Sequence, residues 1–278
     1  MNEIQKLFAK IEVLPPAPTL IPRLMPALTD LNTNFDEVVK MIEVDPALTA
    51  KLLQICNSAF FGPAQPVTEV RQAVNQAGYQ SVYLLASILS GSECFQMPEV
   101  PGVNSKHIWK HSLASAYGAR SVAGAIGLEP GTLFTAGLLH DIGKVVLARA
   151  RGTEYGLLLI RAAQSNTPVY LSEETAYGYN HAEVGASLLE RWDIPPQVVA
   201  GVRYHHKPSD APAEAQKLAA CVNLGNFLAH AQEKPMVMED PDFTFVVGML
   251  KLSADKVREC RERLGESKNV IEAMSKLK

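Results

Sequence analysis

Apolar residues recur every three or four positions along most of the chain, which is the spacing of one face of an α-helix. Asp45-Pro46 begins one such stretch, with proline at the first helical position, and Leu48, Leu52 and Cys56 follow on the same face. No alternation of apolar and polar residues lasts long enough to predict a strand. The pattern therefore predicts an all-α protein. Between residues 68 and 232, helices are expected over 68–76, 78–95, 105–127, 131–150, 153–166, 168–177, 180–192, 195–206 and 212–232.

Two proline-containing polar stretches interrupt this helical pattern. Residues 96–105 (QMPEVPGVNS) contain two prolines and a glycine, and residues 233–242 (EKPMVMEDPD) contain two prolines. We therefore expect an N-terminal helical bundle over 1–100, packed on a second helical bundle over 101–232. A short C-terminal helical extension is expected over 233–278.

Composition narrows the class of protein. The 278 residues are 47% hydrophobic and 20% charged, as in ordinary globular domains. Because 26 basic residues face 29 acidic ones, no extended nucleic-acid surface is evident. The longest apolar stretch, 82–89, is far shorter than the roughly 18 residues of a membrane span, and the N-terminus lacks the apolar core of a signal peptide. Four scattered cysteines without a CxxC pair fit reduced thiols, so we expect a cytoplasmic protein.

The candidate chemistry lies in the histidines of the second bundle. His140 and Asp141 are adjacent within GLLHDIGK, in the apolar helix expected over 131–150. A buried imidazole and carboxylate need a compensating partner, and a divalent metal ion is the natural one. Consecutive helical positions diverge by about 100°. His140 is therefore expected to bind one ion while Asp141 reaches toward a second, as in two-metal phosphoester hydrolysis.

Three other expected helices carry histidines of the same kind. His111 lies 29 residues before His140, which is enough for two antiparallel helices and a turn to bring the rings together. His181 follows Asn180 within a capping-box motif, Asn-His-Ala-Glu, that places it in the first turn of a helix. His205 and His206 stand at the end of an apolar helix.

Each histidine can also be interpreted as a structural residue that binds no metal. A single buried histidine is more often a hydrogen-bonded core residue than a ligand. We keep that interpretation for His107 and His230, which are expected at the surface or behind the ligands. The joint occurrence of the other five histidines with Asp141 favours a shared polar centre. Lys144 is interpreted either as a point charge for a phosphate oxygen or as a solvated cation near a helix end.

His111 and the GLLHDIGK motif resemble the HD superfamily of metal-dependent phosphohydrolases. Three further stretches resemble more specifically the HDOD family, the HD-related output domain of bacterial signalling proteins. They are LPPAP (14–18), DPALTAKLLQICNSAFFG (45–62) and HAEVGASLLERWDIPPQVVAGVRYHHKP (181–208). The resemblance extends from about residue 12 to about residue 230. It implies an N-terminal helical subdomain packed on an HD-like one, and a role as a regulatory output or scaffolding module.

The resemblance also implies a set of metal ligands. Where the phosphohydrolase pattern expects a further carboxylate, this chain has Asn226, with Asn223 one turn earlier. An amide binds a divalent ion less well than a carboxylate does, so one ion fits the centre better than two. The ligand types suit iron or manganese, and also zinc or nickel, more than magnesium or calcium. The implied ligands are His111, His140, Asp141, His181, His205 and His206, with Asn226 as an additional candidate.

Two functions remain open from the sequence. The first is a signalling output module that binds a protein partner or a nucleotide without robust catalysis. It is favoured by Asn226 and by residues 207–212 (KPSDAP), which replace the DGxGYP-type loop of relatives that open cyclic di-GMP. Hydrolysis of cyclic di-GMP is therefore not supported. The second is a phosphohydrolase of a nucleotide or cyclic nucleotide, in which Asp141 would hold the ions and Lys144 would neutralise the transition state. Retention of nearly the whole ligand set favours this second function.

One feature of the N-terminal bundle has two interpretations. Phe60 and Phe61 follow the helix that begins at Pro46 and precede a glycine. They are expected to fill the end of the bundle behind a helix C-cap, and a docking surface for a partner is the alternative.

Overall fold

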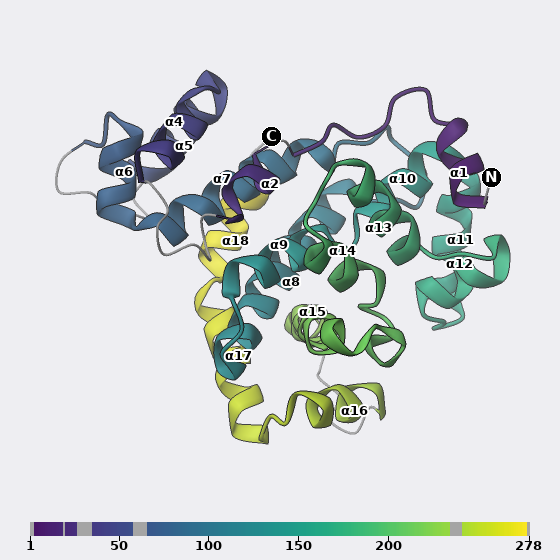
Figure 1. The fold of residues 1–278 in the computed structure, drawn as a ribbon. Coiled ribbons are helices and arrows are strands. Elements are labelled where there is room, and N and C mark those ends of the chain that lie inside the picture. Colours follow the sequence, from purple (N-terminus) through teal and green to yellow (C-terminus); the bar gives the residue numbers. More distant parts are fainter. Residues whose placement is uncertain (1–2, 19, 27–34, 58–65, 234–240, 277–278) are drawn as a thin grey trace.

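The computed structural model describes residues 3–18, 20–26, 35–57, 66–233 and 241–276 (Figure 1). Over these ranges the chain is helical and contains no strand, only an isolated bridge between Val100 and Val103. The predicted all-α class is therefore confirmed. None of the helices described is both long and apolar enough to cross a membrane. Phe60 and Phe61 lie outside the described residues.

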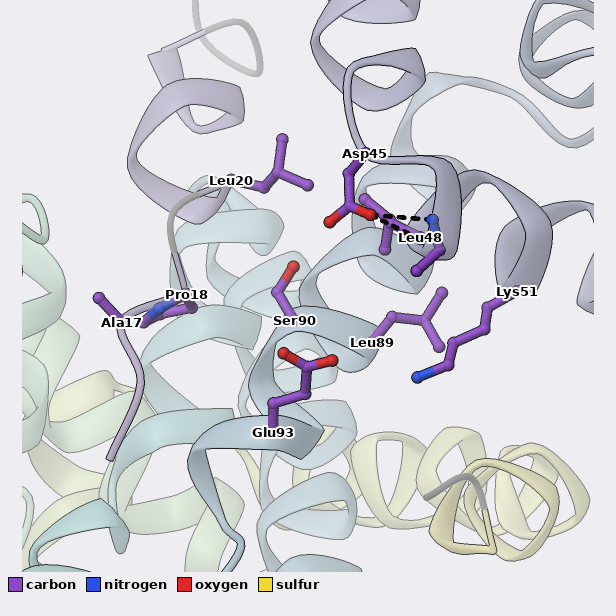
Figure 2. A pocket seen from close by; sticks show the side chains of 10 residues that line it. Ala17, Pro18, Leu20, Asp45, Leu48, Lys51, Leu89, Ser90 and Glu93 are labelled. Atoms are coloured by element: carbon purple, nitrogen blue, oxygen red, sulfur yellow. Dashed lines mark hydrogen bonds between the residues drawn. The ribbon is translucent and has the colours of Figure 1, made fainter. Parts of the chain in front are cut away.

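The N-terminal helices are α1 (Glu3–Ala9), α2 (Ile21–Leu24), α4 (Phe35–Glu43), α5 (Pro46–Cys56), α6 (Val70–Ala77) and α7 (Tyr79–Cys94). Helices α4 to α7 pack on one another, and α7 also packs on α9 (Pro130–Leu139) of the second bundle. The start of α5 confirms the sequence signal at Asp45-Pro46. Asp45 accepts hydrogen bonds from the backbone N–H groups of Ala47 and Leu48, both at 3.0 Å, beside a cavity of about 70 Å³ (Figure 2).

The second bundle is arranged around α8. Its elements are α8 (Ser105–Ile126), α9 (Pro130–Leu139), α10 (Ile142–Arg151), α11 (Thr153–Gln164), α12 (Val169–Tyr177), α13 (His181–Arg191), α14 (Pro196–Arg203) and α15 (Ala213–Glu233). Helices α9 and α15 make the most extensive contacts with α8. Gly118 of α8 lies so close to Gly225 of α15 that a Cβ atom on Gly118 would come within 2.7 Å of the Gly225 carbonyl oxygen. This close approach brings His111 of α8 near Asn226 of α15.

The prediction of a single helix over residues 131–150 is wrong in one respect. The structure divides it into α9 and α10, and the break falls at His140-Asp141. Asp141 has φ −98° and ψ 6°, outside the helical range, and starts α10 in a new direction. The turn lets Gly143 approach the backbone of α13 more closely than any residue with a Cβ atom could. His140 and Asp141 are therefore presented by a turn between two helices, and not by consecutive positions of one helix.

The last part of the chain forms α16 (Pro241–Leu250), α17 (Ala254–Glu266) and α18 (Lys268–Ser275). Helix α16 packs on α15, where the rings of Phe227 and Phe243 lie 4.8 Å apart. Helices α17 and α18 pack on α8, so the extension covers the side of the second bundle away from α10 and α13 (Figure 1).

Candidate metal centre

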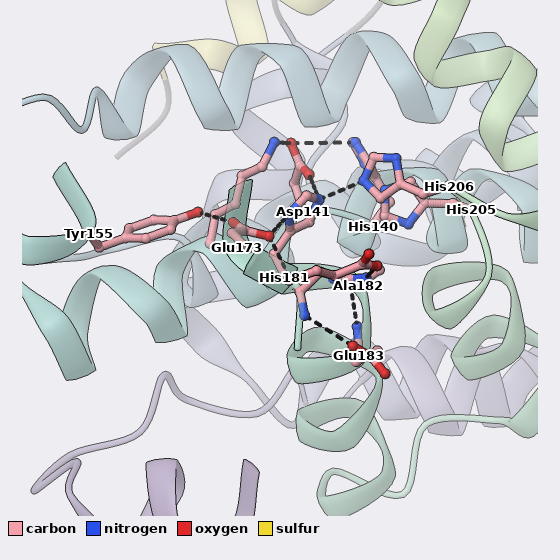
Figure 3. Close-up of polar contacts among 12 residues, drawn as sticks. His140, Asp141, Tyr155, Glu173, His181, Ala182, Glu183, His205 and His206 are labelled. Carbon is pink, nitrogen blue, oxygen red and sulfur yellow. Dashed lines mark hydrogen bonds and ion pairs between the residues drawn. The ribbon is translucent and has the colours of Figure 1, made fainter. Parts of the chain in front are cut away.

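The histidines singled out from the sequence converge on one buried centre together with Asp141, and Figure 3 labels His140, His181, His205 and His206 around that aspartate. They come from α8, from the α9–α10 turn, from the first residue of α13 and from the segment after α14. The side chains form two groups of three, and within each group the potential ligand atoms lie within 4.8 Å of one another. The groups are His111, His140 and Asp141, here called the HD group, and His181, His205 and His206, here called the three-histidine group.

Asp141 belongs to the HD group but also contacts the three-histidine group, and it is 2% exposed. Its Oδ1 atom is 3.2 Å from Nε2 of His181, and its Oδ2 atom is 3.4 Å from Nε2 of His140. Lys144, one turn later, places its ammonium group 2.7 Å from Oδ2. Burial alone would raise the pKa of Asp141, but the neighbouring Lys144 ammonium group and the hydrogen bond from His181 outweigh it and hold this pKa well below its usual value. The carboxylate is thus charged and shared between the groups.

Two histidines carry nitrogen atoms that lack a hydrogen-bond partner among the described residues. Nδ1 of His140 donates to the carbonyl oxygen of Gly137 at 2.8 Å, and Nδ1 of His205 donates to that of Val202 at 2.7 Å. The proton of each neutral ring is then on Nδ1, and Nε2 carries the lone pair. Both Nε2 atoms are buried and make no hydrogen bond within the described ranges. Burial lowers the pKa of each ring to about 3, so both remain neutral.

This arrangement fits a metal ion. A buried nitrogen without a partner is costly, and a neutral imidazole whose other nitrogen donates to a carbonyl or carboxylate is the usual form of a metal-binding histidine. Imidazole nitrogen with one carboxylate is a donor set that suits iron, manganese, zinc or nickel.

His181 is held by a glutamate that the sequence analysis missed. Glu173 of α12 is fully buried and accepts hydrogen bonds from Nδ1 of His181 at 2.6 Å and from the backbone N–H of His181 at 2.7 Å. Tyr155 of α11 donates to the other carboxylate oxygen at 2.6 Å (Figure 3). Burial lowers the pKa of His181, but Glu173 outweighs that effect and the pKa is raised. The adjacent Glu174 is half-buried at the surface, and no sequence pattern distinguished the two.

The local sequence explains how α13 begins at this histidine. Asn180 accepts hydrogen bonds from the backbone N–H groups of Ala182 and Glu183, and Glu183 in turn accepts one from the backbone of Asn180. The predicted capping box is therefore confirmed. It fixes His181 at the first position of α13, directed into the centre.

His206 forms the more open edge of the centre. Its Nε2 atom lies 2.9 Å from Nε2 of His181, and its ring stacks on Tyr170 of α12 at 4.2 Å between centroids. Burial and the neighbouring His205 and His181 hold its pKa well below the usual value. Lys207 pairs with Glu174 at 3.0 Å beside it. The contribution of Tyr170 had no signal in the sequence.

The opposite edge of the centre is formed by α8 and α15. Nε2 of His111 is 2.8 Å from Oδ1 of Asn226 and 3.3 Å from the hydroxyl of Ser115. Asn223, one turn earlier, points elsewhere and donates to the carbonyl oxygen of His205 at 2.7 Å. His230 places its ring 4.2 Å from that of His111.

The remaining candidates are placed as follows. His107 and His230 are both exposed and flank His111 on the outer side of the centre. Lys144 is partly buried and is bound to Asp141, so it is not a freely solvated cation.

Comparison with known proteins gives a family and a fold. Residues 14–208, more than half of the chain, match the model of the HDOD domain. An HDOD domain protein from Geobacter sulfurreducens has a crystal structure with a TM-score of 0.77, at 23% identity, covering 98% of this chain and 96% of that one. At this level of identity the likeness shows the fold alone.

Two curated relatives match parts of the chain. An uncharacterized protein of Treponema pallidum (strain Nichols) is 27% identical over 223 residues, which cover 78% of this chain and 42% of that protein. A Ribonuclease Y of Thermus thermophilus is 29% identical over 106 residues, covering 38% of this chain and 14% of the enzyme. The chain therefore spans less than half the length of these relatives.

Proposed function

The chain belongs to the HDOD family, and from that premise we propose that it is a regulatory output protein that holds a divalent metal ion in the His–Asp centre and signals without robust catalysis. The observation that carries this proposal is the pair of buried Nε2 atoms on His140 and His205. Both lack a hydrogen-bond partner among the described residues while their Nδ1 atoms are already bonded. A bound ion removes this cost.

The weak-catalysis part of the proposal rests on charge. Two adjacent ions need more negative charge than one, because their mutual repulsion must be offset. Asp141 is the carboxylate that the two ligand groups share, and Lys144 already neutralises one of its oxygens. Asn226 contributes a neutral amide where a second carboxylate is expected. A single ion therefore fits this centre best, and iron or manganese is our first choice.

The first experiment is elemental analysis of the full chain, purified without air, chelator or metal-affinity tag. About one equivalent of iron, manganese, zinc or nickel is the expected result. Metal at background level would contradict the proposal and leave a degenerate centre whose histidines are structural. Near two equivalents would contradict the single-ion centre and favour the phosphohydrolase described next.

A metal-dependent phosphohydrolase of a nucleotide or cyclic nucleotide is the second candidate function. It is favoured by the contact of Lys144 with Asp141. This contact holds a cation beside the candidate metal ligands, where it would bind an oxygen of the phosphate group. The relationship to Ribonuclease Y, an enzyme of RNA by its name, agrees with phosphodiester chemistry. Screening metal-loaded protein against linear and cyclic nucleotides tests this candidate, and turnover that Lys144→Met abolishes would support it.

The signal is proposed to pass to a protein partner in the cytoplasm of a bacterium. A nucleotide bound at the His–Asp centre is the alternative ligand. Affinity purification of the tagged chain from its native cells, with an Asp141→Ala variant in parallel, identifies partners that depend on the centre.

A further inference from the structure

The two ligand groups are unequally prepared for an ion. In the HD group, Nε2 of His111 already has a partner, the amide oxygen of Asn226 at 2.8 Å. The Oδ2 atom of Asp141, which faces His140, is bound by the Lys144 ammonium group at 2.7 Å. An ion at this position would compete with a hydrogen bond and be repelled by a fixed positive charge.

The three-histidine group resembles the HD group in its nitrogen atoms and differs in the oxygen of Asp141 that it faces. His205 offers a buried Nε2 atom with no hydrogen-bond partner among the residues described, as His140 does in the HD group. The other carboxylate oxygen of Asp141, Oδ1, lies 3.2 Å from Nε2 of His181, on the side away from the oxygen that Lys144 binds. Nε2 of His206 forms a 2.9 Å hydrogen bond with Nε2 of His181, and an ion would replace this bond by binding both nitrogen atoms. His140 borders both groups, with its ring 5.0 Å from His205 and 5.4 Å from His111.

Glu173 adds negative charge on this side of the centre. Its carboxylate accepts a hydrogen bond from Nδ1–H of His181 at 2.6 Å, which pushes electron density toward Nε2 and strengthens the imidazole as a ligand. The hydroxyl of Tyr155 and the backbone N–H of His181 hold this carboxylate in place. A fully buried carboxylate is costly unless it is paired, and these three donors compensate the burial of Glu173.

We propose that the single ion is held by the three-histidine group together with Asp141, and that Glu173 is the positioning residue that supplies, through His181, the charge that Asn226 does not. The ion therefore lies away from His111 and Asn226. This inference rests on the proposed metal binding and assigns its place.

The test compares cobalt(II) binding by metal-free full-length protein and by two neighbouring variants. Glu173→Gln keeps a hydrogen-bond acceptor for His181 and removes the charge, and it is expected to weaken binding by about 10- to 100-fold. Glu174→Gln changes the next residue of the same helix, which pairs with Lys207 at the surface, and is expected to bind as the unmodified chain does. Far-ultraviolet circular dichroism checks that each variant is folded.

A second measurement needs no variant. X-ray absorption of the cobalt-loaded chain counts imidazole ligands, and we expect three or more, whereas an ion in the HD group would show at most two, from His111 and His140. Two imidazoles, or equal affinity of Glu173→Gln and the unmodified chain, would overturn this inference and leave the proposed metal binding intact. No cobalt binding by the unmodified chain would overturn both.

Discussion

Two aspartates stand at the same helical position in different regions of the molecule. Asp45 starts α5 in the N-terminal bundle, is exposed, and caps the helix by accepting from two backbone N–H groups. Asp141 starts α10 in the second bundle, is buried, and makes no capping hydrogen bond from its side chain to the backbone of α10. Its carboxylate is directed instead to His181 and to the Lys144 side chain.

The difference shows that the same residue type can either stabilise its own helix or contact side chains of a site built from several helices. A capping side chain typically stabilises a helix by about 1 kcal/mol, and Asp141 gives up that contribution. Its negative charge instead compensates the positive charge of Lys144 and is shared with His181 in a centre built from several helices. We therefore expect substitutions of the two aspartates to have different effects on metal content and on stability.

The largest expected effect is that of Asp141→Ala. Removing a buried charged partner leaves Lys144 uncompensated and typically costs about 3–5 kcal/mol. The same change removes a shared ligand, so metal content should fall to background together with the melting temperature. Elemental analysis and thermal unfolding measure the two losses. Loss of stability with full metal content would mean that Asp141 is a structural residue only.

A carboxylate added on the opposite side of the centre should have the next largest effect. Asn226→Asp places a charge within reach of Nε2 of His111 and is expected to raise the metal content from one to two equivalents. At a metal concentration about 100 times its Kd, the second ion adds about 2.7 kcal/mol to the free energy of unfolding. Metal titration followed by unfolding in urea measures both changes.

The matched control for that variant is Asn223→Asp, one turn earlier on the same helix. Asn223 donates to the backbone of His205, so aspartate there loses a donor without facing His111. One equivalent of metal is expected. A second equivalent in this control would show that any added carboxylate on α15 recruits an ion.

Acidification should separate the two regions in the metal-free protein. The folded-state pKa values of His140 and His205 are about 3, below the ordinary value of about 6.5. The unfolded chain therefore binds more protons as the pH falls below about 6.5, and stability declines from there toward pH 3, by at most about 1.4 kcal/mol per pH unit for each ring. Residues 1–100 contain no histidine. Hydrogen exchange at about pH 7 and about pH 5.5, on either side of the ordinary histidine pKa, should thus show loss of protection first around α9, α10 and α14. Equal loss across α5–α7 would contradict this.

The smallest expected effect is that of Asp45→Ala. The helix cap is lost, so the free energy of unfolding should fall by about 1 kcal/mol. Metal content should stay at the level of the unmodified chain, because Asp45 caps a helix of the N-terminal bundle and the centre lies in the second bundle. Urea unfolding and elemental analysis check both points. Metal loss in this variant would indicate coupling between the N-terminal bundle and the centre.

The sequence was sufficient to predict a local structure wherever the interactions that stabilise it lie within one short stretch of the chain. The helix start at Asp45-Pro46 and the capping box at Asn180 are such cases, because the groups that stabilise them lie within four residues of each other. The apolar periodicity was likewise sufficient for the all-α class. The break at His140-Asp141 escaped the same reasoning, because an apolar run on both sides of a turn has the periodicity of one helix.

The sequence by itself determined the helical class, the family and the identity of most side chains in the centre, because histidines and an aspartate in an ordered pattern are visible without coordinates. Only the tertiary structure decided which partners those side chains have. Glu173 and Glu174 are neighbours of the same type, and packing alone buries the first against His181 and pairs the second with Lys207. The physical reason is that hydrogen bonds and charge compensation in this centre join residues from different helices, whose approach depends on the packing of the whole bundle.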